Sequence, residues 1–210
     1  MPTAIVWGAN GGIGQALLRE LGQEGWQTAA FARTITELEG DNLHSFKADL
    51  SKPYTVQEAT MSASYDIEAA DLWVYAAGDI SKTNVAEMTP ALWQQLIEAN
   101  LTGAYLAFHH SLPLLAEKAH LVFLGAYHEK LRLPGLSAYA AAKAGLEAFA
   151  QTLAKEQRSR RVTIVRPSAV DTPFWEKVPL KLPPNALTAT AVAQQILAAY
   201  HEGHKGFLDL

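Results

Sequence analysis

The sequence predicts a single α/β domain built around a doubly wound parallel sheet. Short apolar runs alternate along the chain with longer segments of helical periodicity, which is the order that repeated βαβ units require. Several of these runs are apolar throughout, as expected for strands that helices cover on both faces. With 210 residues and 49% hydrophobic composition the chain can bury one sizeable core, so we predict one domain at 1–210.

About seven strands are expected, with helices on both faces of the sheet. The predicted strands are the apolar runs at 3–8, 27–32, 44–48, 71–78, 120–125, 162–167 and 206–210. The predicted helices are the periodic segments at about 13–24, 54–63, 90–116, 137–158 and 188–203. A short Pro-rich stretch at about 172–188 is expected to be a loop of the same domain that lies near the substrate.

The composition excludes several classes of function. A formal net charge of −4 argues against nucleic acid or an anionic membrane as the main partner. The chain has no cysteine, which excludes disulfides, zinc thiolates and thiol catalysis, and its seven histidines lack metal-ligand spacing. The first residues do not have the pattern of a signal peptide, and no apolar run approaches the roughly 20 residues of a membrane span. We therefore expect a cytoplasmic protein without a metal site that acts on a small molecule.

A glycine-rich turn directly follows the first predicted strand. The segment GANGGIG places Gly8, Gly12 and Gly14 in a GxxxGxG pattern that opens the first helix. Glycines here let a pyrophosphate approach the backbone and the helix N-terminus, where free amides and the helix dipole favour an anion. A tight turn without a ligand would also use glycines, but the order strand, turn and helix favours dinucleotide binding.

The end of the second predicted strand bears on the choice of cofactor. A cofactor with a free ribose 2′-hydroxyl usually meets an Asp or Glu at this point, whereas this chain has Arg33 and Thr34. A guanidinium suits a 2′-phosphate, so we predict that NADP(H) is favoured over NAD(H). An ordinary solvated arginine at a strand end is the alternative.

Two further segments are candidates for cofactor contacts. Asp49, after the third predicted strand, can accept a hydrogen bond from the adenine amino group, or it can cap a turn. The small residues Ala76, Ala77 and Gly78, after the fourth strand, would let a cofactor lie flat, although tight packing would select them as well.

Tyr139 and Lys143 lie four residues apart in an alanine-rich predicted helix. Residues at i and i+4 share a helix face, so the ammonium group of Lys143 is expected to lower the pKa of the tyrosine from about 10. Lys143 stands in an otherwise apolar stretch, where an ammonium group without a partner is costly. The alternative is a lysine that extends along the helix surface to reach water. We predict a catalytic pair.

Taken together, the segments GANGGIG, ADL, AAG, EANLTGAY, YAAAK and VRPSAVDTP resemble the short-chain dehydrogenase/reductase family in order and spacing, over about residues 5–208. The resemblance implies a Rossmann fold in which Tyr139 is the general acid/base. It also implies that Lys143 lowers the tyrosine pKa and holds the nicotinamide ribose, and that Asn100 supports a proton relay. The implied cofactor-binding residues are Gly8, Asn10, Gly12, Ile13, Gly14, Arg33, Thr34, Asp49, Leu50, Ala76, Ala77, Gly78, Asn100, Tyr139, Lys143, Pro167, Val170 and Thr172.

The chain departs from the family pattern at three positions. Trp7 precedes Gly8 where the family usually has threonine, and Ser168 replaces a glycine. The largest departure is Ala126, which takes the place of the serine that usually helps to bind the reacting oxygen. The nearby candidates for the missing donor are Tyr127, His128, Ser137 and Ser168, of which we favour His128.

The substrate side of the site gives fewer signals. Phe174 and Trp175, which follow the sixth predicted strand, either form the floor of a substrate pocket or pack in the core. The Gly125–Ala126 pair is similar to that of the dihydropteridine reductases, family members that work without the serine. Those enzymes differ from this chain at the positions of Arg33 and Asn100.

We therefore predict an NADP(H)-dependent oxidoreductase that transfers hydride to a carbonyl or conjugated (quinonoid) acceptor. The alternative is a non-catalytic NADP(H)-binding regulator that has lost the active-site serine. By resemblance, the helices at 90–116 and 137–158 are expected to pair across a two-fold axis in a homodimer, and a tetramer remains possible.

Overall fold

The computed structural model describes residues 1–34, 40, 42–127, 131–177 and 181–210. Its main sheet has seven strands, all parallel, in the order β3-β2-β1-β4-β5-β6-β9. The strands are β1 (Thr3–Trp7), β2 (Gln27–Ala32), β3 (Leu43–Lys47), β4 (Ala70–Tyr75), β5 (Leu115–Leu124), β6 (Arg161–Arg166) and β9 (Gly206–Asp209). The predicted doubly wound sheet is confirmed.

The strand order creates a switch point at the centre of the sheet. The chain runs outward from β1 to β3 on one side and then from β4 to β9 on the other. Because β1 and β4 are neighbours whose following connections diverge, a crevice is expected beyond their carboxyl ends, where open α/β sheets bind ligands.

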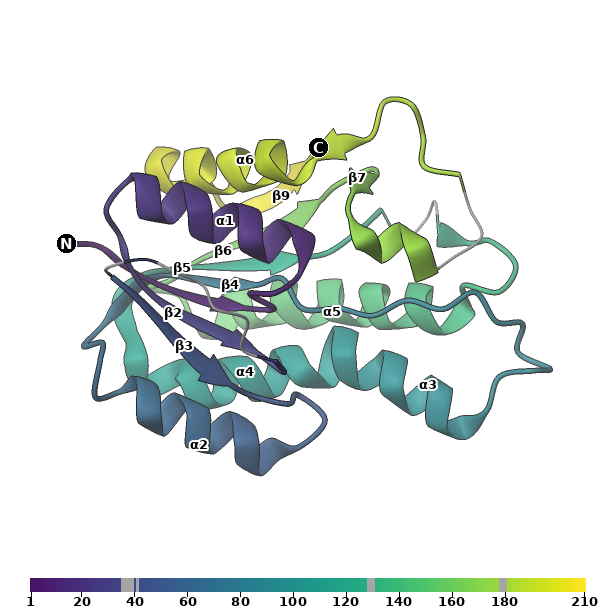
Figure 1. The fold of residues 1–210 in the computed structure, drawn as a ribbon, viewed down its shortest axis with the longest axis horizontal. Coiled ribbons are helices and arrows are strands. Elements are labelled where there is room, and N and C mark those ends of the chain that lie inside the picture. The colour runs from purple at the N-terminus through teal and green to yellow at the C-terminus, as the bar shows by residue number, and fades with distance from the viewer. Residues whose placement is uncertain (35–39, 41, 128–130, 178–180) are drawn as a thin grey trace.

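Helices cover both faces of the sheet (Figure 1). One face carries α1 (Gly12–Gln23) and α6 (Ala189–Glu202), and the other carries α2 (Pro53–Ala63), α4 (Gly103–Ser111) and α5 (Ser137–Glu156). Neighbouring residues of one strand therefore enter different cores: Ile5 packs in the cluster on the α2–α4–α5 side, and Val6 packs in the cluster on the α1–α6 side. This explains why the strands are apolar throughout.

Trp7 belongs to the first of these cores. Its ring stacks on Phe31 with ring centroids 4.1 Å apart, and its indole Nε1 donates to the Ser111 hydroxyl at 3.2 Å. The departure from threonine at this position is thus accommodated by packing below the glycine turn.

The predicted single helix at 90–116 is wrong in its continuity. It consists of α3 (Pro90–Ile97), a π-helical segment η1 (Glu98–Thr102), α4 and a 3₁₀ turn (Leu112–Leu114), and β5 begins at Leu115. In the π-helical segment the Gly103 amide donates to the carbonyl of Glu98, five residues earlier. The buried hydroxyl of Tyr75, at the end of β4, donates to the Ala99 carbonyl at 2.7 Å and so satisfies an oxygen in the segment.

The stretch at 172–188 contains more regular structure than a loop. A short strand β7 (Val170–Asp171) pairs in parallel with β8 (Leu187–Thr188), and the 3₁₀ helix η4 (Pro173–Lys177) lies between them. The described part of the chain has no helix that is both long and apolar enough to cross a membrane.

Candidate active site

The candidate catalytic pair lies on α5, where the helix passes the carboxyl ends of β4 and β5. Both Tyr139 and Lys143 are buried. The ammonium group of Lys143 donates to the main-chain carbonyl of Leu124, the last residue of β5, at 2.7 Å. The same Nζ lies 5.7 Å from the centroid of the Tyr139 ring. The i,i+4 spacing thus places the two groups side by side, as the sequence predicts.

Burial shifts the pKa of both groups in the direction of the uncharged form. It lowers the pKa of Lys143 to about 8, so the side chain is still largely protonated at pH 7. It raises the pKa of Tyr139, which therefore keeps its proton. We expected Lys143 to lower the tyrosine pKa. In this arrangement burial outweighs the ammonium group, whose proton is directed at Leu124.

Asn100 lies inside the π-helical segment and is fully buried. Its Nδ2 donates to the carbonyl of Asp79 at 2.7 Å and to the carbonyl of Leu96 at 2.9 Å. Its Oδ1 is buried without a hydrogen-bond partner. A buried acceptor without a partner is rare and marks a place where a polar group of a ligand or a water fits.

The surface that faces Asn100 and Lys143 is the bare backbone of Gly78. A Cβ atom at Gly78 would lie 2.9 Å from Asn100 Oδ1 and 3.8 Å from Lys143 Nζ. The exposed Gly78 thus places no side chain over these two buried polar groups, and it follows the small residues Ala76 and Ala77 that we predicted to border the cofactor.

The substrate side of Tyr139 is covered by apolar groups. Tyr139 packs with Ile80 and Leu136, and the ring of Phe174 has its centroid 5.9 Å from that of the tyrosine. Trp175 packs against the same cluster. Phe174 and Trp175 therefore adjoin the catalytic candidate and help to cover it.

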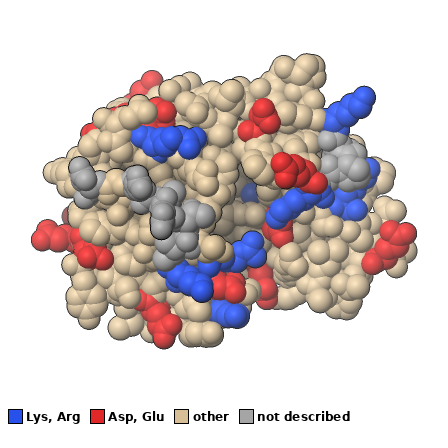
Figure 2. All heavy atoms as spheres, viewed as in Figure 1, with Lys and Arg blue, Asp and Glu red and all other residues tan. Residues whose placement is uncertain are grey.

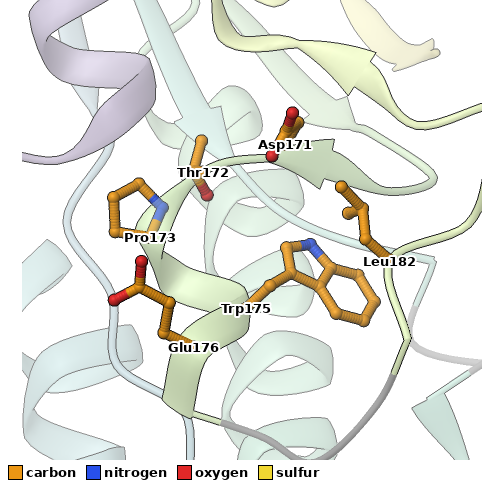
Figure 3. A pocket seen from close by; sticks show the side chains of 6 residues that line it. All are labelled: Asp171, Thr172, Pro173, Trp175, Glu176 and Leu182. Atoms are coloured by element: carbon orange, nitrogen blue, oxygen red, sulfur yellow. The ribbon is translucent and has the colours of Figure 1, made fainter.

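A surface hollow of about 520 Å³ adjoins this region (Figure 3). Its lining side chains come from β7, η4 and the segment after it: Asp171, Thr172, Pro173, Trp175, Glu176 and Leu182. One of its lining residues, Trp175, also packs against the cluster around Tyr139. Another, Thr172, lies against Gly12 of the glycine turn. The hollow thus lies on the outer side of the same helix η4.

Among the described residues, none of the candidate side chains takes the place of the missing serine hydroxyl beside Tyr139. Ala126 follows β5, and the side chain of Tyr127 lies under the Arg166 guanidinium, 4.9 Å from its ring centroid, toward the edge strands. Ser168 is exposed and its amide donates to the Leu210 carbonyl at 2.8 Å. Ser137 is exposed at the first turn of α5.

His128, the favoured candidate donor, lies outside the described residues. Within the described ranges, no hydrogen bond joins another side chain to the Tyr139 hydroxyl. The structure therefore leaves the oxygen of an acceptor with one described donor, the tyrosine itself.

The glycine turn packs tightly against the rest of the site. Gly8 has a positive φ of +83°, and a Cβ there would lie 2.4 Å from the Ala77 amide nitrogen. A Cβ at Gly14 would lie 2.2 Å from the Gly8 carbonyl, and one at Gly12 would lie 2.5 Å from Thr172 Cγ2. These contacts bring the turn together with Ala77 and with Thr172, two other predicted cofactor residues.

The start of α1 fits a negatively charged ligand. Gly11 is its N-cap without a side-chain hydrogen bond, and the first turn of the helix has no acidic residue. The free amide groups and the positive end of the helix dipole can therefore hold a pyrophosphate. The glycine turn lies against Ala77, and Gly78 lies against the partnerless Asn100 Oδ1. Because these groups adjoin one another at the carboxyl edge of the sheet, the residues present fit a nicotinamide dinucleotide.

The adenosine end of the crevice lies beyond β2 and β3. Arg33 and Thr34 are exposed, and the side-chain amide of Asn10 donates to the Thr34 carbonyl. Asp49 accepts from the Ser51 amide at 3.1 Å and from the Ser51 hydroxyl at 2.8 Å, so it caps a turn. Burial alone would raise the pKa of Asp49, but these hydrogen bonds and the charges of Lys52 and Arg33 hold it below its usual value.

The remaining predicted cofactor residues are mainly packing groups at the edge of the crevice. Ile13 and Ala76 pack against the α1–α6 core, and Leu50 packs against the opposite core. Val170 is buried in the α1–α6 core, and Pro167 lies between β6 and β7.

Sequence reasoning missed two residues that shape this site. Asp79 holds the amide of Asn100 through its carbonyl, and Tyr75 holds the π-helical segment through its hydroxyl. Asp79 could have been found from the sequence, because it is a charged residue directly after the small residues that follow β4. Nothing in the sequence distinguishes Tyr75 from the other aromatic residues of the strands.

Known proteins provide an independent comparison. The family model described as short chain dehydrogenase matches residues 2–182. A 3beta-hydroxysteroid dehydrogenase 1 from Eggerthella lenta is 29% identical over 187 residues, covering 82% of this chain and 72% of the relative. A nodulation protein G from Rhizobium sp. (strain N33) is 28% identical over 185 residues, covering 83% of this chain and 76% of the relative.

Solved structures share the whole fold. An alcohol dehydrogenase from Thermococcus sibiricus, complexed with 5-hydroxy-NADP, has a TM-score of 0.89 at 23% identity, covering 100% of this chain and 96% of that one. A ligand-free aldohexose dehydrogenase from Thermoplasma acidophilum has a TM-score of 0.88 at 18% identity, covering 100% and 92%. At these identities the likeness shows the fold alone.

Proposed function

This chain belongs to the short-chain dehydrogenase family and is an oxidoreductase, and from that premise we propose that it transfers hydride from NADPH to a conjugated carbonyl or quinonoid acceptor, with Tyr139 as the proton donor. The observation that carries the proposal is the cluster of polar groups at Gly78. There a buried lysine and a partnerless asparagine oxygen face one bare stretch of backbone, beside a tyrosine that keeps its proton.

The proton step follows from the state of Tyr139. When the cofactor is bound, the nicotinamide supplies the hydride. Reduction of a carbonyl also needs a proton at the oxygen, and a tyrosine whose pKa is raised by burial holds one at neutral pH. Lys143 and Asn100 are placed to orient polar groups of the cofactor or a water behind the tyrosine. The arrangement thus supports reduction.

The preference for NADP(H) rests on Arg33. The guanidinium is exposed at the carboxyl end of β2, where a 2′-phosphate would lie, and Asp49 nearby is occupied by Ser51 and Lys52. No described carboxylate in the immediate continuation of β2 would repel the phosphate.

The acceptor class rests on Ala126 and on the apolar cover of Tyr139. Loss of one preorganised donor to a developing oxyanion typically costs about 10²–10³ in rate. A simple ketone, whose oxygen takes the full negative charge, would suffer that loss, whereas a conjugated ring delocalises the charge. The rings of Phe174 and Trp175 beside Tyr139 suit a flat apolar acceptor.

A non-catalytic NADP(H)-binding regulator is the alternative function. It is favoured by Ala126 and by the closed cover over Tyr139. Against it stands the presence of Tyr139 together with Lys143 and Asn100, because a protein that only binds the nucleotide has less need of the tyrosine.

A homodimer is proposed as the assembly. Tyr105 on α4 and Trp93 on α3 are 48% and 41% exposed, and Ala141 and Ala148 lie on the exposed face of α5. Such apolar helix faces would be covered by a second copy of the chain. Light scattering at micromolar concentration should give twice the monomer mass; a monomer would contradict the proposal.

The function is tested by following NADPH absorbance with a panel of acceptors: aliphatic ketones, quinones and quinonoid dihydropterins. We expect oxidation of NADPH with the conjugated acceptors and weak activity on plain ketones. If NADPH binds and no acceptor is reduced, the regulator is the correct alternative.

A further inference from the structure

Asp79 is a buried carboxylate that the proposed reaction does not use. It follows Gly78 at the exit of β4 and is 8% exposed. Its Oδ1 accepts from Lys177 Nζ at 2.5 Å and from the Ile80 amide at 3.0 Å, and its Oδ2 accepts from Gln95 Nε2 at 2.7 Å. A buried carboxylate is costly unless it is paired in this way.

The three contacts of Asp79 reach both sides of the site. Gln95 belongs to α3, one residue before Leu96, whose carbonyl accepts from Asn100. Lys177 is the last residue of η4, 98 positions away from Asp79 in sequence. The main-chain carbonyl of Asp79 itself accepts from Asn100 Nδ2. One residue therefore joins the short helix η4 to the segment that positions Asn100.

The short helix η4 also carries the cover of the candidate catalytic group. Phe174 and Trp175 belong to it and pack in the cluster around Tyr139, which is 8% exposed. For an acceptor to reach the tyrosine, η4 would have to shift. Among the described residues, the Lys177–Asp79 ion pair is a polar contact that would resist such a shift.

We propose that Asp79 is a positioning residue that, through Lys177, holds η4 against Tyr139 and links this closure to the placement of Asn100. Burial alone would raise the pKa of Asp79, but the contacts of Lys177 and Gln95 hold it below its usual value, so the carboxylate stays charged at neutral pH. The ion pair therefore persists there as a contact between charged groups, sensitive to salt because Lys177 is about half exposed. The closure of η4 does not depend on the proposed function. Only the effect of the closure on turnover rests on the proposed function.

Closure is measured without any reaction, by hydrogen exchange of the amides at 174–177 in the unliganded protein. In Lys177→Gln and in Asp79→Asn we expect exchange to become roughly three- to tenfold faster. Asp79→Asn keeps the main-chain carbonyl that holds Asn100, so it removes the charge alone. The double variant should exchange no faster than the faster of the two single variants. Lys177→Arg, which keeps the positive charge, should keep the slow exchange of the wild type.

The matched control is Lys181→Gln, which removes the same charge from an exposed lysine a few residues beyond η4. Exchange at 174–177 should not change in it. Raising the salt concentration should speed exchange in the wild type and leave Lys177→Gln unaffected. Unchanged exchange in Lys177→Gln would overturn the proposal, and so would effects of the two single variants that simply add. Because Lys177 is half exposed, its variants remain interpretable even if Asp79→Asn does not fold.

Kinetics then test the link to the reaction. Lys177→Gln should lower KM for the acceptor about three- to tenfold, because η4 then shifts away from Tyr139 more readily, with a smaller change in kcat and no change in NADPH affinity. If the two single variants exchange faster but the wild type reduces no acceptor, the closure of η4 stands and the proposed function is refuted. Faster exchange with an unaltered KM would show that η4 does not control access, which overturns the positioning role of Asp79.

Discussion

Two buried basic groups lie at the two ends of the part of β5 that pairs with β6, residues 120–124, and they differ in what surrounds them. At its carboxyl end Lys143 of α5 donates to the Leu124 carbonyl at 2.7 Å, and at its amino end His120 Nε2 lies 2.7 Å from the Thr163 hydroxyl. Burial is the main cause of a lowered pKa in both: to about 8 for Lys143, and to about 4 for His120, where the charges of Arg161 and His204 add to it. At pH 7 the lysine is therefore largely charged and the histidine is neutral.

The difference lies in access. Lys143 borders the exposed backbone of Gly78, so a ligand can meet its charge. His120 is fully buried, and its ring is stacked on Tyr200 with centroids 6.1 Å apart, between β6 and α6. Each end also has a polar atom without a partner, Asn100 Oδ1 and His120 Nδ1. Burial and a missing partner alone therefore do not distinguish the candidate site; the exposed backbone of Gly78 beside Lys143 and Asn100 is what sets it apart.

The largest expected effect tests the carboxyl end directly. Tyr139→Phe should lower turnover about 10²–10⁴-fold, the usual scale for loss of a general acid, and leave NADPH affinity nearly intact. Steady-state kinetics and a cofactor titration measure the two. Tyr200→Phe is the matched control at the amino end and should retain turnover. Unchanged turnover in Tyr139→Phe would mean that another residue moves the proton.

The next effect concerns the amino end. The pKa of His120 is about 4 in the folded protein and about 6.5 when unfolded, so the unfolded chain binds more protons between these values. The free energy of unfolding should be fully retained above pH 6.5 and fall by up to about 3 kcal/mol as the pH decreases toward 4. Urea unfolding at several pH values measures this.

The histidine variants make that measurement specific. In His120→Gln the decrease between pH 6.5 and 4 should become shallower, because the titrating group is gone. His109→Gln, on the exposed side of α4, should keep the wild-type slope. An equal slope in both variants would place the pH dependence elsewhere.

A smaller effect is expected at the end of β2. A charge-assisted contact between Arg33 and a 2′-phosphate is worth roughly 1.5–3 kcal/mol, so Arg33→Ala should weaken NADPH binding about tenfold or more. The affinity for NADH, which lacks that phosphate, is the internal control and should hardly change. Equal affinities of the wild type for the two cofactors would refute the preference.

The smallest effect is expected at Ala126. A hydroxyl in Ala126→Ser would add a second donor beside Tyr139, and we expect the activity on aliphatic ketones to rise by about tenfold relative to that on quinonoid acceptors. The ratio of kcat/KM for the two acceptor classes is the measurement. A wild type that reduces both classes equally well would show that a donor is already present.

The sequence predicted the sheet because the evidence for it is local. Each strand is a short apolar run. Neighbouring residues such as Ile5 and Val6 are both apolar because the strand is buried on both faces, and this pattern can be read from the sequence. The glycine turn and the Tyr139–Lys143 spacing are local in the same way, and the structure brings both to the carboxyl edge of the sheet.

The features that the sequence did not predict depend on contacts between distant parts of the chain. The break at Glu98–Thr102 leaves the apolar periodicity almost intact, and the Tyr75 hydroxyl that supports it comes from a strand more than twenty residues earlier. The tyrosine pKa depends on the cover by Phe174 and its helix, which the spacing of Tyr139 and Lys143 does not reveal. The Lys177–Asp79 pair joins segments 98 positions apart.

The π-helical segment makes the site depend on chain length as well as on residue identity. Each residue of an α-helix turns the chain by about 100°, and a π-helical turn takes up one residue more than the α-helical turn it replaces. If one residue were removed from Glu98–Thr102, regular hydrogen bonds could form throughout, and α3 would keep its orientation against α4 because both kinds of turn complete one rotation. The residues within the segment would shift instead, among them Ala99, whose carbonyl now accepts from the buried Tyr75 hydroxyl. The extra residue is thus part of the packing between this helix and β4, and a shorter, more regular helix would put a buried hydrogen bond at risk.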